Sequence, residues 1–157
     1  MGSKYTFENK TSQDKFKELL LQYDEFRKDS TNSTKATELS VNAWHLIDWI
    51  FEEFRAIHLT NSIGDFRTTL YPQCESLKIM HDIANGAKHS EVTRPKATIK
   101  STGRPEGAFE SAFAREFEQT YLEIVMEDGT KLWFVDEIAK VIKFWKEYFR
   151  DRLNIIV

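Results

Sequence analysis

The chain has 157 residues, a formal charge of −3 at neutral pH, 41% hydrophobic and 30% charged residues, and one cysteine. These values fit one globular domain with its own core, and the negative charge excludes a general nucleic-acid coat while leaving room for local basic patches. Cys74 alone excludes an intramolecular disulfide and favours a reducing compartment. With no apolar run of ~18 residues and no signal-peptide pattern, we expect a cytoplasmic protein without membrane contact.

Apolar residues at helical spacing predict a first helix over residues 12–28, and Thr11 or Ser12 can cap its start. The second predicted helix, residues 34–57, is the longest and carries apolar side chains on two sides. A helix of this kind is either central in the fold or part of an oligomer interface.

A loop is predicted over residues 58–69, followed by a third helix over 72–88, because Pro72 suits the first helical turn. Residues 89–135 contain proline, glycine and β-rich runs and predict an insertion of loop and β-structure.

Within this insertion, residues 97–100 favour a short strand. Two β-rich runs, residues 121–126 and 131–135, flank an Asp-Gly pair and predict a β-hairpin. Asp136 is the predicted cap of a last helix that ends near Arg152.

The expected fold class is therefore mainly α: a four-helix bundle with a small β-hairpin inserted before the last helix. Residues 1–10 are polar and predict a flexible leader, and residues 11–157 form the single predicted domain.

The third predicted helix ends in the sequence HDIANGAKH. At 100° per residue, His81, Asn85 and His89 follow one another along one edge of this helix, and Asp82 and Lys88 flank them. Two imidazoles, an amide, a carboxylate and an ammonium on one edge indicate a site better than they indicate a core.

A metal site fits this edge poorly. His81 and His89 would be about 12 Å apart along the helix axis, and a helical zinc pair at i and i+4 would have to use Asn85. A site would require His45 of the second helix to join His81 and Asp82. We therefore predict no metal and no other cofactor.

Acid–base chemistry on a phosphodiester fits the residue types better. His89 would move a proton near neutral pH, Lys88 would hold the phosphate, and Asn85 would position His89 or a ribose hydroxyl. An alternative stays open at this point, in which His89 and Lys88 stabilise the helix C-terminus and Asn85 satisfies a loop carbonyl.

The segment after the motif is basic, with five cations against the single acid Glu91. The cations are Lys88, Arg94, Lys96, Lys100 and Arg104. This segment is either a solvated loop or a loop that closes over an anionic ligand beside His89. In the second case His81, Asp82, Arg94 and Lys96 are the predicted substrate-binding residues.

The motif, on the third helix of a predicted helical bundle, resembles the signature of the HEPN superfamily. Its ribonuclease members carry an arginine, a polar residue that is often asparagine, three variable positions and a histidine. Asn85 and His89 match this pattern, whereas Ala84 occupies the position of the arginine. In active members, arginine and histidine from two protomers meet at a dimer interface and cleave RNA without metal. The resemblance implies a homodimer that acts on RNA, with His89, Asn85 and Lys88 as catalytic residues.

The loss of the arginine implies either a non-cleaving member or its replacement by Lys88, one turn beyond Ala84. The runs WHLIDW (44–49) and DIANGAKH (82–89) also resemble small uncharacterised bacterial and phage-borne proteins. The expected function is thus an RNA-acting or nucleotide-binding domain of a defence or toxin-type system. The alternative is a non-catalytic module of the same fold that binds a protein partner.

Overall fold

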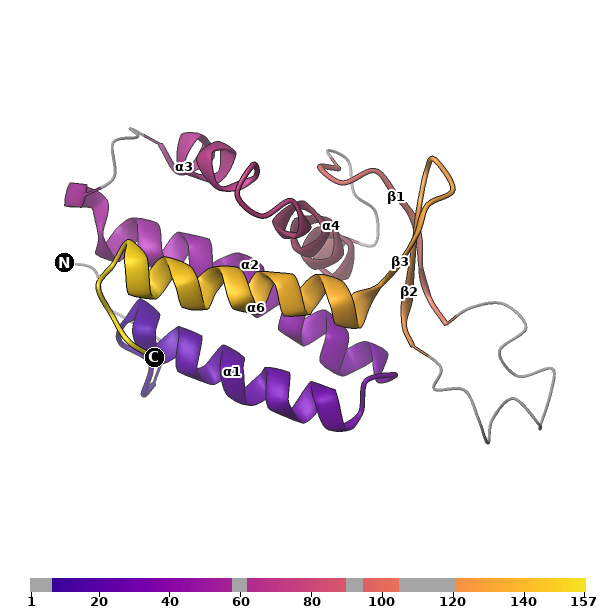
Figure 1. Ribbon diagram of the computed structural model, residues 1–157, viewed down its shortest axis with the longest axis horizontal. Coiled ribbons are helices and arrows are strands. Elements are labelled where there is room, and N and C mark those ends of the chain that lie inside the picture. The colour runs from indigo at the N-terminus through magenta and orange to yellow at the C-terminus, as the bar shows by residue number, and fades with distance from the viewer. Residues whose placement is uncertain (1–6, 58–61, 90–94, 105–120) are drawn as a thin grey trace.

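The computed structural model describes residues 7–57, 62–89, 95–104 and 121–157. Within these ranges the protein is mainly helical and has a small antiparallel sheet of three strands before the last helix (Figure 1). The elements are α1 (Ser12–Lys28), α2 (Ser33–Glu53), the 3₁₀ helix η1 (Arg55–Ile57), α3 (Ile63–Leu70), α4 (Ser76–His89), β1 (Ile99–Gly103), β2 (Glu123–Met126), β3 (Lys131–Trp133) and α6 (Phe134–Asp151).

The expectation of four helices requires a correction, because the described residues contain five α-helices. The additional helix is α3, which occupies much of the predicted loop. The side chain of Ser62 accepts a hydrogen bond from the backbone N–H of Asp65 at 3.1 Å and so caps its start. Phe66 and Leu70, four residues apart, are both buried and hold the helix against the core.

The second and third predicted helices also differ at their ends. α2 stops at Glu53 and the chain continues as η1. α4 begins at Ser76 and not at Pro72, because Pro72 lies in the turn that joins α3 to α4. There the carbonyl of Leu70 accepts hydrogen bonds from the two residues after Pro72, at 3.0 and 3.1 Å.

The first helix and the hairpin are confirmed. α1 covers Ser12–Lys28, and Thr11 and Asp14 form a capping box at its start. β2 and β3 pair antiparallel around the predicted turn, in which Gly129 has a positive φ of 91°. A short strand is also predicted over residues 97–100; the observed strand β1 lies slightly later, at Ile99–Gly103, and pairs with β2 to complete a sheet in the order β1-β2-β3.

The last helix begins at Phe134 with Trp133 as its N-cap, three residues earlier than the predicted cap Asp136. β3 passes directly into α6: Trp133 ends the strand and is also the N-cap of the helix, without a side-chain capping bond. Asp136 therefore lies in the first turn of α6, where its carboxylate still interacts favourably with the helix dipole.

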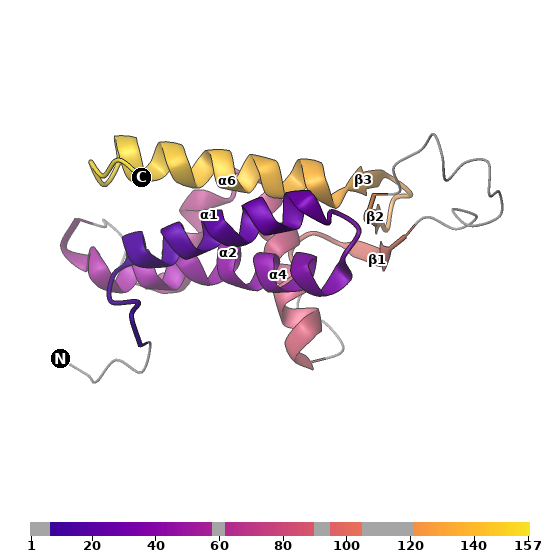
Figure 2. The same cartoon turned by 90° about the horizontal axis from the view of Figure 1, so that it is seen from below.

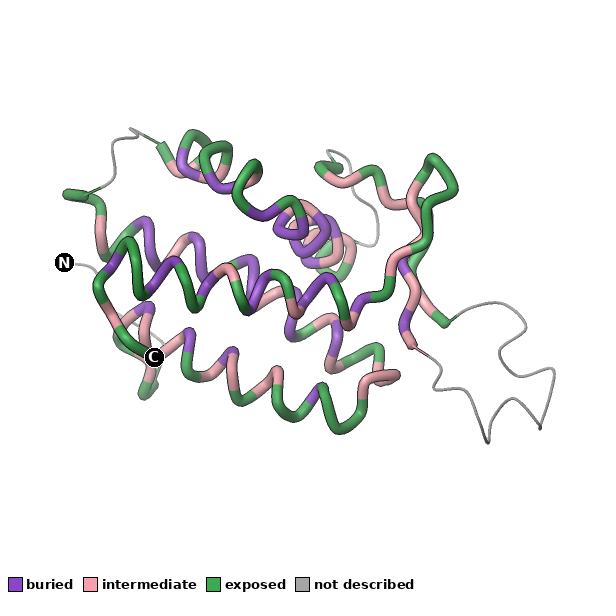
Figure 3. Tube along the Cα trace, viewed as in Figure 1, coloured by how far each residue is buried: buried purple, intermediate pink, exposed green. Residues whose placement is uncertain are grey.

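The core is centred on α2, which contacts α1, α3, α4 and α6. Its apolar side chains on two sides are thus explained within one chain. Figure 3 shows buried residues gathered along α2 and at intervals along the neighbouring helices. The sheet lies at one end of the helices, and the C-terminal turns of α4 extend away from the body (Figure 2). No helix among the described residues has the length and apolarity needed to cross a bilayer.

Candidate functional site

Asp82 lies buried in α4 and holds the segment that leads into β1. Its carboxylate accepts hydrogen bonds from the backbone N–H of Lys96, at 2.8 and 3.0 Å, and of Ala97, at 2.8 Å. Burial raises the pKa of Asp82, but the hydrogen bonds from His81 and from these two amides outweigh it and leave the pKa below its usual value. The ionised carboxylate thus fixes the backbone of residues 96–97 on α4.

His81 stands between Asp82 and Asn85. Its Nδ1 is 2.7 Å from Oδ1 of Asp82, and its Nε2 is 2.8 Å from Nδ2 of Asn85. An ionised carboxylate only accepts hydrogen bonds, so Nδ1 of His81 carries the proton that it donates to Asp82. The ring also lies edge-on to Trp44, with centroids 4.8 Å apart. Both ring nitrogens of His81 are therefore engaged in contacts within the protein.

Beyond His81, α3 and α4 each contribute a cation to the surroundings of His45 on α2. The guanidinium of Arg67, on α3, lies 5.1 Å from the ring centroid of Trp44 and pairs with Asp48 at 2.8 Å. His45, on α2, lies close enough to Arg67 and to Lys88 of α4 to feel the charge of both. We define the cationic face as His45, Arg67 and Lys88.

Burial and the charged groups around His45 shift its pKa. Burial lowers its pKa most, the cations of Lys15, Arg67 and Lys88 lower it further, and Asp48 opposes them. The net pKa lies below the usual histidine value, so His45 is neutral at pH 7. A neutral imidazole beside cations is chemically able to accept a proton.

Lys88 and His89 are exposed in the last turn of α4. Lys88 forms no ion pair within the described part of the chain. The side chain of Lys96 is also exposed, although its backbone is held by Asp82. Arg94 lies outside the described residues. The structure thus joins His81, Asp82 and Asn85 by hydrogen bonds, brings Lys88 within electrostatic range of His45, and leaves His89 at the exposed end of the helix.

Two other chemistries find little support in the described residues. There, no three His, Cys, Asp or Glu side chains come together in a group able to hold a metal ion. Cys74 is buried, and burial raises the pKa of its thiol, which keeps it in the less reactive protonated form. This confirms that Cys74 is a small core residue.

A groove of about 410 Å³ runs along a neighbouring side of α4. The small residues Gly86 and Ala87 line it from the helix, and Lys100, Ser101 and Thr102 line it from β1. His81, Asn85 and Lys88 do not belong to its lining. Its polar lining comprises the hydroxyls of Thr37, Ser101 and Thr102, the ammonium of Lys100 and the carboxylate of Asp82.

Sequence reasoning missed Arg67 as a site residue because its segment was predicted to be a loop. The signal for a short helix was present, since Ser62 precedes Asp65 at capping distance and Phe66 and Leu70 share a face. The contribution of His45 depended on how α2 crosses α4, which spacing along one helix does not give.

Comparison of the chain with protein-family models, with curated proteins and with solved structures gives no match.

Proposed function

We propose that the chain is a HEPN-like domain of a bacterial or phage defence or toxin-type system, and that it acts on RNA at the cationic face. One observation carries the proposal: the guanidinium of Arg67 lies 5.1 Å from the ring centroid of Trp44, and the same ring contacts His81 edge-on at 4.8 Å, so a cation of α3 lies beside the helix that also carries Lys88. Converging cations bind the phosphates of RNA, and the imidazole of His89, the residue after Lys88, would supply proton transfer.

The arginine that the resemblance requires is absent at Ala84, and two residues can take its role. Lys88 follows one turn later on α4, and Arg67 approaches from α3 beside Trp44. Either cation would stabilise charge on a phosphodiester while His89 takes the proton of the ribose 2′-hydroxyl. That oxygen then attacks phosphorus, and the 5′-oxygen of the next nucleotide leaves with a proton from water. No metal takes part in this scheme.

A homodimer belongs to the same proposal; since the apolar sides of α2 are covered within the chain, the exposed end of α4 is the part that would meet the second copy. In active members of the superfamily the histidine of one protomer meets the arginine of the other. His89 extends from the body at the end of α4 and is exposed, so it is available to a second copy of the chain.

The test is a gel assay of purified protein with labelled RNA in excess EDTA. Wild type should cleave the RNA, and His89→Ala should abolish cleavage. Of Arg67→Ala and Lys88→Ala, the variant that loses more cleavage activity identifies the residue that replaces the arginine. Lys143→Ala, an exposed lysine on α6, is the matched control for removing one surface charge. Unchanged cleavage by His89→Ala would overturn the assignment of His89.

The alternative is a non-catalytic module that binds a protein partner. Two observations favour it. The polar atoms of His81, Asp82 and Asn85 form hydrogen bonds within the protein. The position of the family's arginine is occupied by the uncharged Ala84. A wild-type protein that neither cleaves nor binds RNA would favour this module over the RNA-acting domain.

A further inference from the structure

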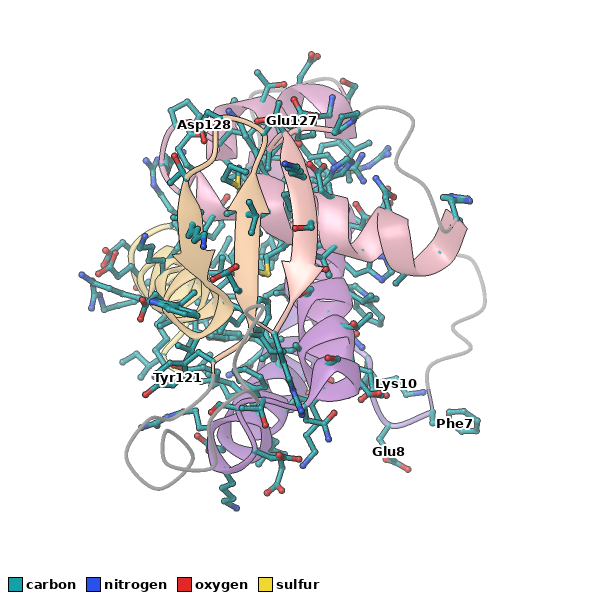
Figure 4. All side chains as sticks on the ribbon, turned by 90° about the vertical axis from the view of Figure 1, so that its right-hand side faces the viewer. Phe7, Glu8, Lys10, Tyr121, Glu127 and Asp128 are labelled. Carbon is teal, nitrogen blue, oxygen red and sulfur yellow. The ribbon has the colours of Figure 1, made fainter. Side chains whose placement is uncertain are left out.

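The outer face of the three-stranded sheet carries a separate group of chemically active side chains. Along β3, Leu132 packs against the core, so Lys131 and Trp133 on either side of it point to the opposite face. In β2, Ile124 is buried and pairs with Leu132, which fixes the same inner and outer faces for that strand. Figure 4 looks onto the outer face.

A β-bulge adds a second lysine to this face. β1 advances from Ile99 to Ser101 while β2 moves by one residue, so Lys100 is the extra residue of the bulge. Lys100 and Ser101 both line a hollow of about 490 Å³ on the sheet, which Lys131 also lines.

The hollow is positively charged. Its lining contains the three cations Lys100, Arg104 and Lys131 against the single carboxylate of Glu123. Lys100 and Lys131 form no ion pair in the ranges that the structure describes. β1 and β3 are the two edge strands of the sheet, on either side of β2. The backbones that carry these two lysines are therefore two strand spacings apart, about 10 Å. A phosphodiester chain that crosses the sheet would contact both.

Trp133 adds an aromatic surface beside the lysines. It is 39% exposed, which is high for a tryptophan, and its ring stands edge-to-face with Tyr121 at 5.8 Å between centroids. Tyr121 lies at the end of the sheet opposite to the acidic turn of Glu127 and Asp128 (Figure 4). Cations and aromatic rings therefore share one face, with the acidic turn at its far end.

We infer that the outer face of the sheet binds single-stranded RNA, with phosphates at Lys100 and Lys131 and an unpaired base stacked on Trp133. Stacking on an aromatic ring needs a base that is free of a duplex, whereas the lysines need only the phosphate chain. This inference rests on the proposed function, RNA binding, and adds that the bound RNA is single-stranded.

The test measures fluorescence anisotropy of a labelled 12-nucleotide single-stranded RNA, and of the same sequence as a duplex, over a series of salt concentrations. Trp133→Ala should weaken single-strand binding about 5- to 150-fold, and Trp133→Phe should restore most of it. Lys131→Ala and Lys100→Ala should each reduce the salt slope of log affinity by about 0.7. The duplex should bind more weakly and should not respond to Trp133→Ala.

Two controls make the result specific. Leu21→Ala removes an exposed apolar side chain from α1, and Lys143→Ala removes an exposed cation from α6. Neither should change binding. Circular dichroism of each variant tests that α6 still forms after the change at Trp133.

The outcomes separate this inference from the proposed function. If Arg67→Ala and Lys88→Ala weaken binding while the sheet variants do not, the sheet inference is wrong and the cationic face stands. If only the sheet variants weaken binding, the cationic face is wrong and the sheet inference stands. If wild type binds neither RNA, both are wrong.

Discussion

Asp82 joins the helical motif to the sheet through one buried carboxylate. Its oxygens hold the backbone of residues 96–97, two residues before β1 begins, and they also fix the ring of His81. This single side chain therefore sets both the orientation of His81 and the position at which β1 starts.

The substitution Asp82→Asn should lower the free energy of unfolding by about 2–4 kcal/mol, because an amide offers one acceptor oxygen and turns a donor toward backbone N–H groups. Urea denaturation measures the change. Asp128→Asn is the matched control: Asp128 also accepts a backbone N–H, from Thr130 at 2.8 Å, but it is exposed. The control should cost less than about 1 kcal/mol. Equal losses in both variants would contradict a special role for Asp82.

The same carboxylate predicts a pH dependence. The pKa of Asp82 is lower in the folded protein than in the unfolded chain, where it is about 3.9. Its stabilisation is therefore complete above that value and is lost as the pH falls through the folded pKa. The difference in unfolding free energy between wild type and Asp82→Asn should stay constant from pH 7 to 5 and shrink below about pH 4.

Among the helices and strands, those marked by residues close together in the sequence could be predicted. α1 has a capping box and a regular apolar stripe, and the hairpin has an Asp-Gly turn, so both followed from neighbouring residues. α3 is two turns long with two buried side chains, too little periodicity to separate it from a loop. The start of α4 depends on the turn that connects it to α3.

The candidate site could likewise be predicted only where its residues are neighbours in the sequence. His81, Asp82 and Asn85 lie within one helix, so their proximity could be predicted from helical spacing. Arg67 and His45 reach the same region from other helices, and only the packing of α2, α3 and α4 brings them together. The hydrogen bonds of Asp82 to residues 96–97 likewise depend on the fold of a loop.

Packing of these helices predicts the titration of His45. By proton NMR, its midpoint should lie below the usual value near 6.5. Lys88→Ala should raise the midpoint, because a nearby cation is removed, and Asp48→Asn should lower it. Lys143→Ala, on the exposed side of α6, should leave it unchanged. If Lys88→Ala leaves the titration midpoint of His45 unchanged, Lys88 does not lie close enough to His45 to affect its pKa.

For the whole molecule, aromatic contacts close the fold between its first and last helices. Phe16 of α1 stacks on Phe149 of α6 with ring centroids 4.7 Å apart, and Phe26 meets Phe134 edge-on at 5.3 Å. Trp145 is fully buried and donates a hydrogen bond to the carbonyl of Ala43 at 3.2 Å. These contacts bind α6 to α1 and to the central helix α2.

Phe16→Ala should therefore destabilise the protein by about 3–5 kcal/mol, since it removes a fully buried ring and leaves a cavity against Phe149. Chemical denaturation measures the loss. Leu21→Ala, on the exposed side of the same helix, should change the unfolding free energy by no more than about 0.5 kcal/mol. Similar effects in both variants would contradict the packing of α1 on α6.

The central position of Trp145 has a consequence during protein synthesis. Its partner Ala43 precedes it by 102 residues, so α1 and α2 leave the ribosome long before α6 exists to cover them. At a translation rate of about 5–20 residues per second, the apolar side chains of α1 and α2 remain uncovered by α6 for roughly 5–20 s. Completion of the core is thus a late event in translation, and the nascent chain is exposed to association with other chains until then.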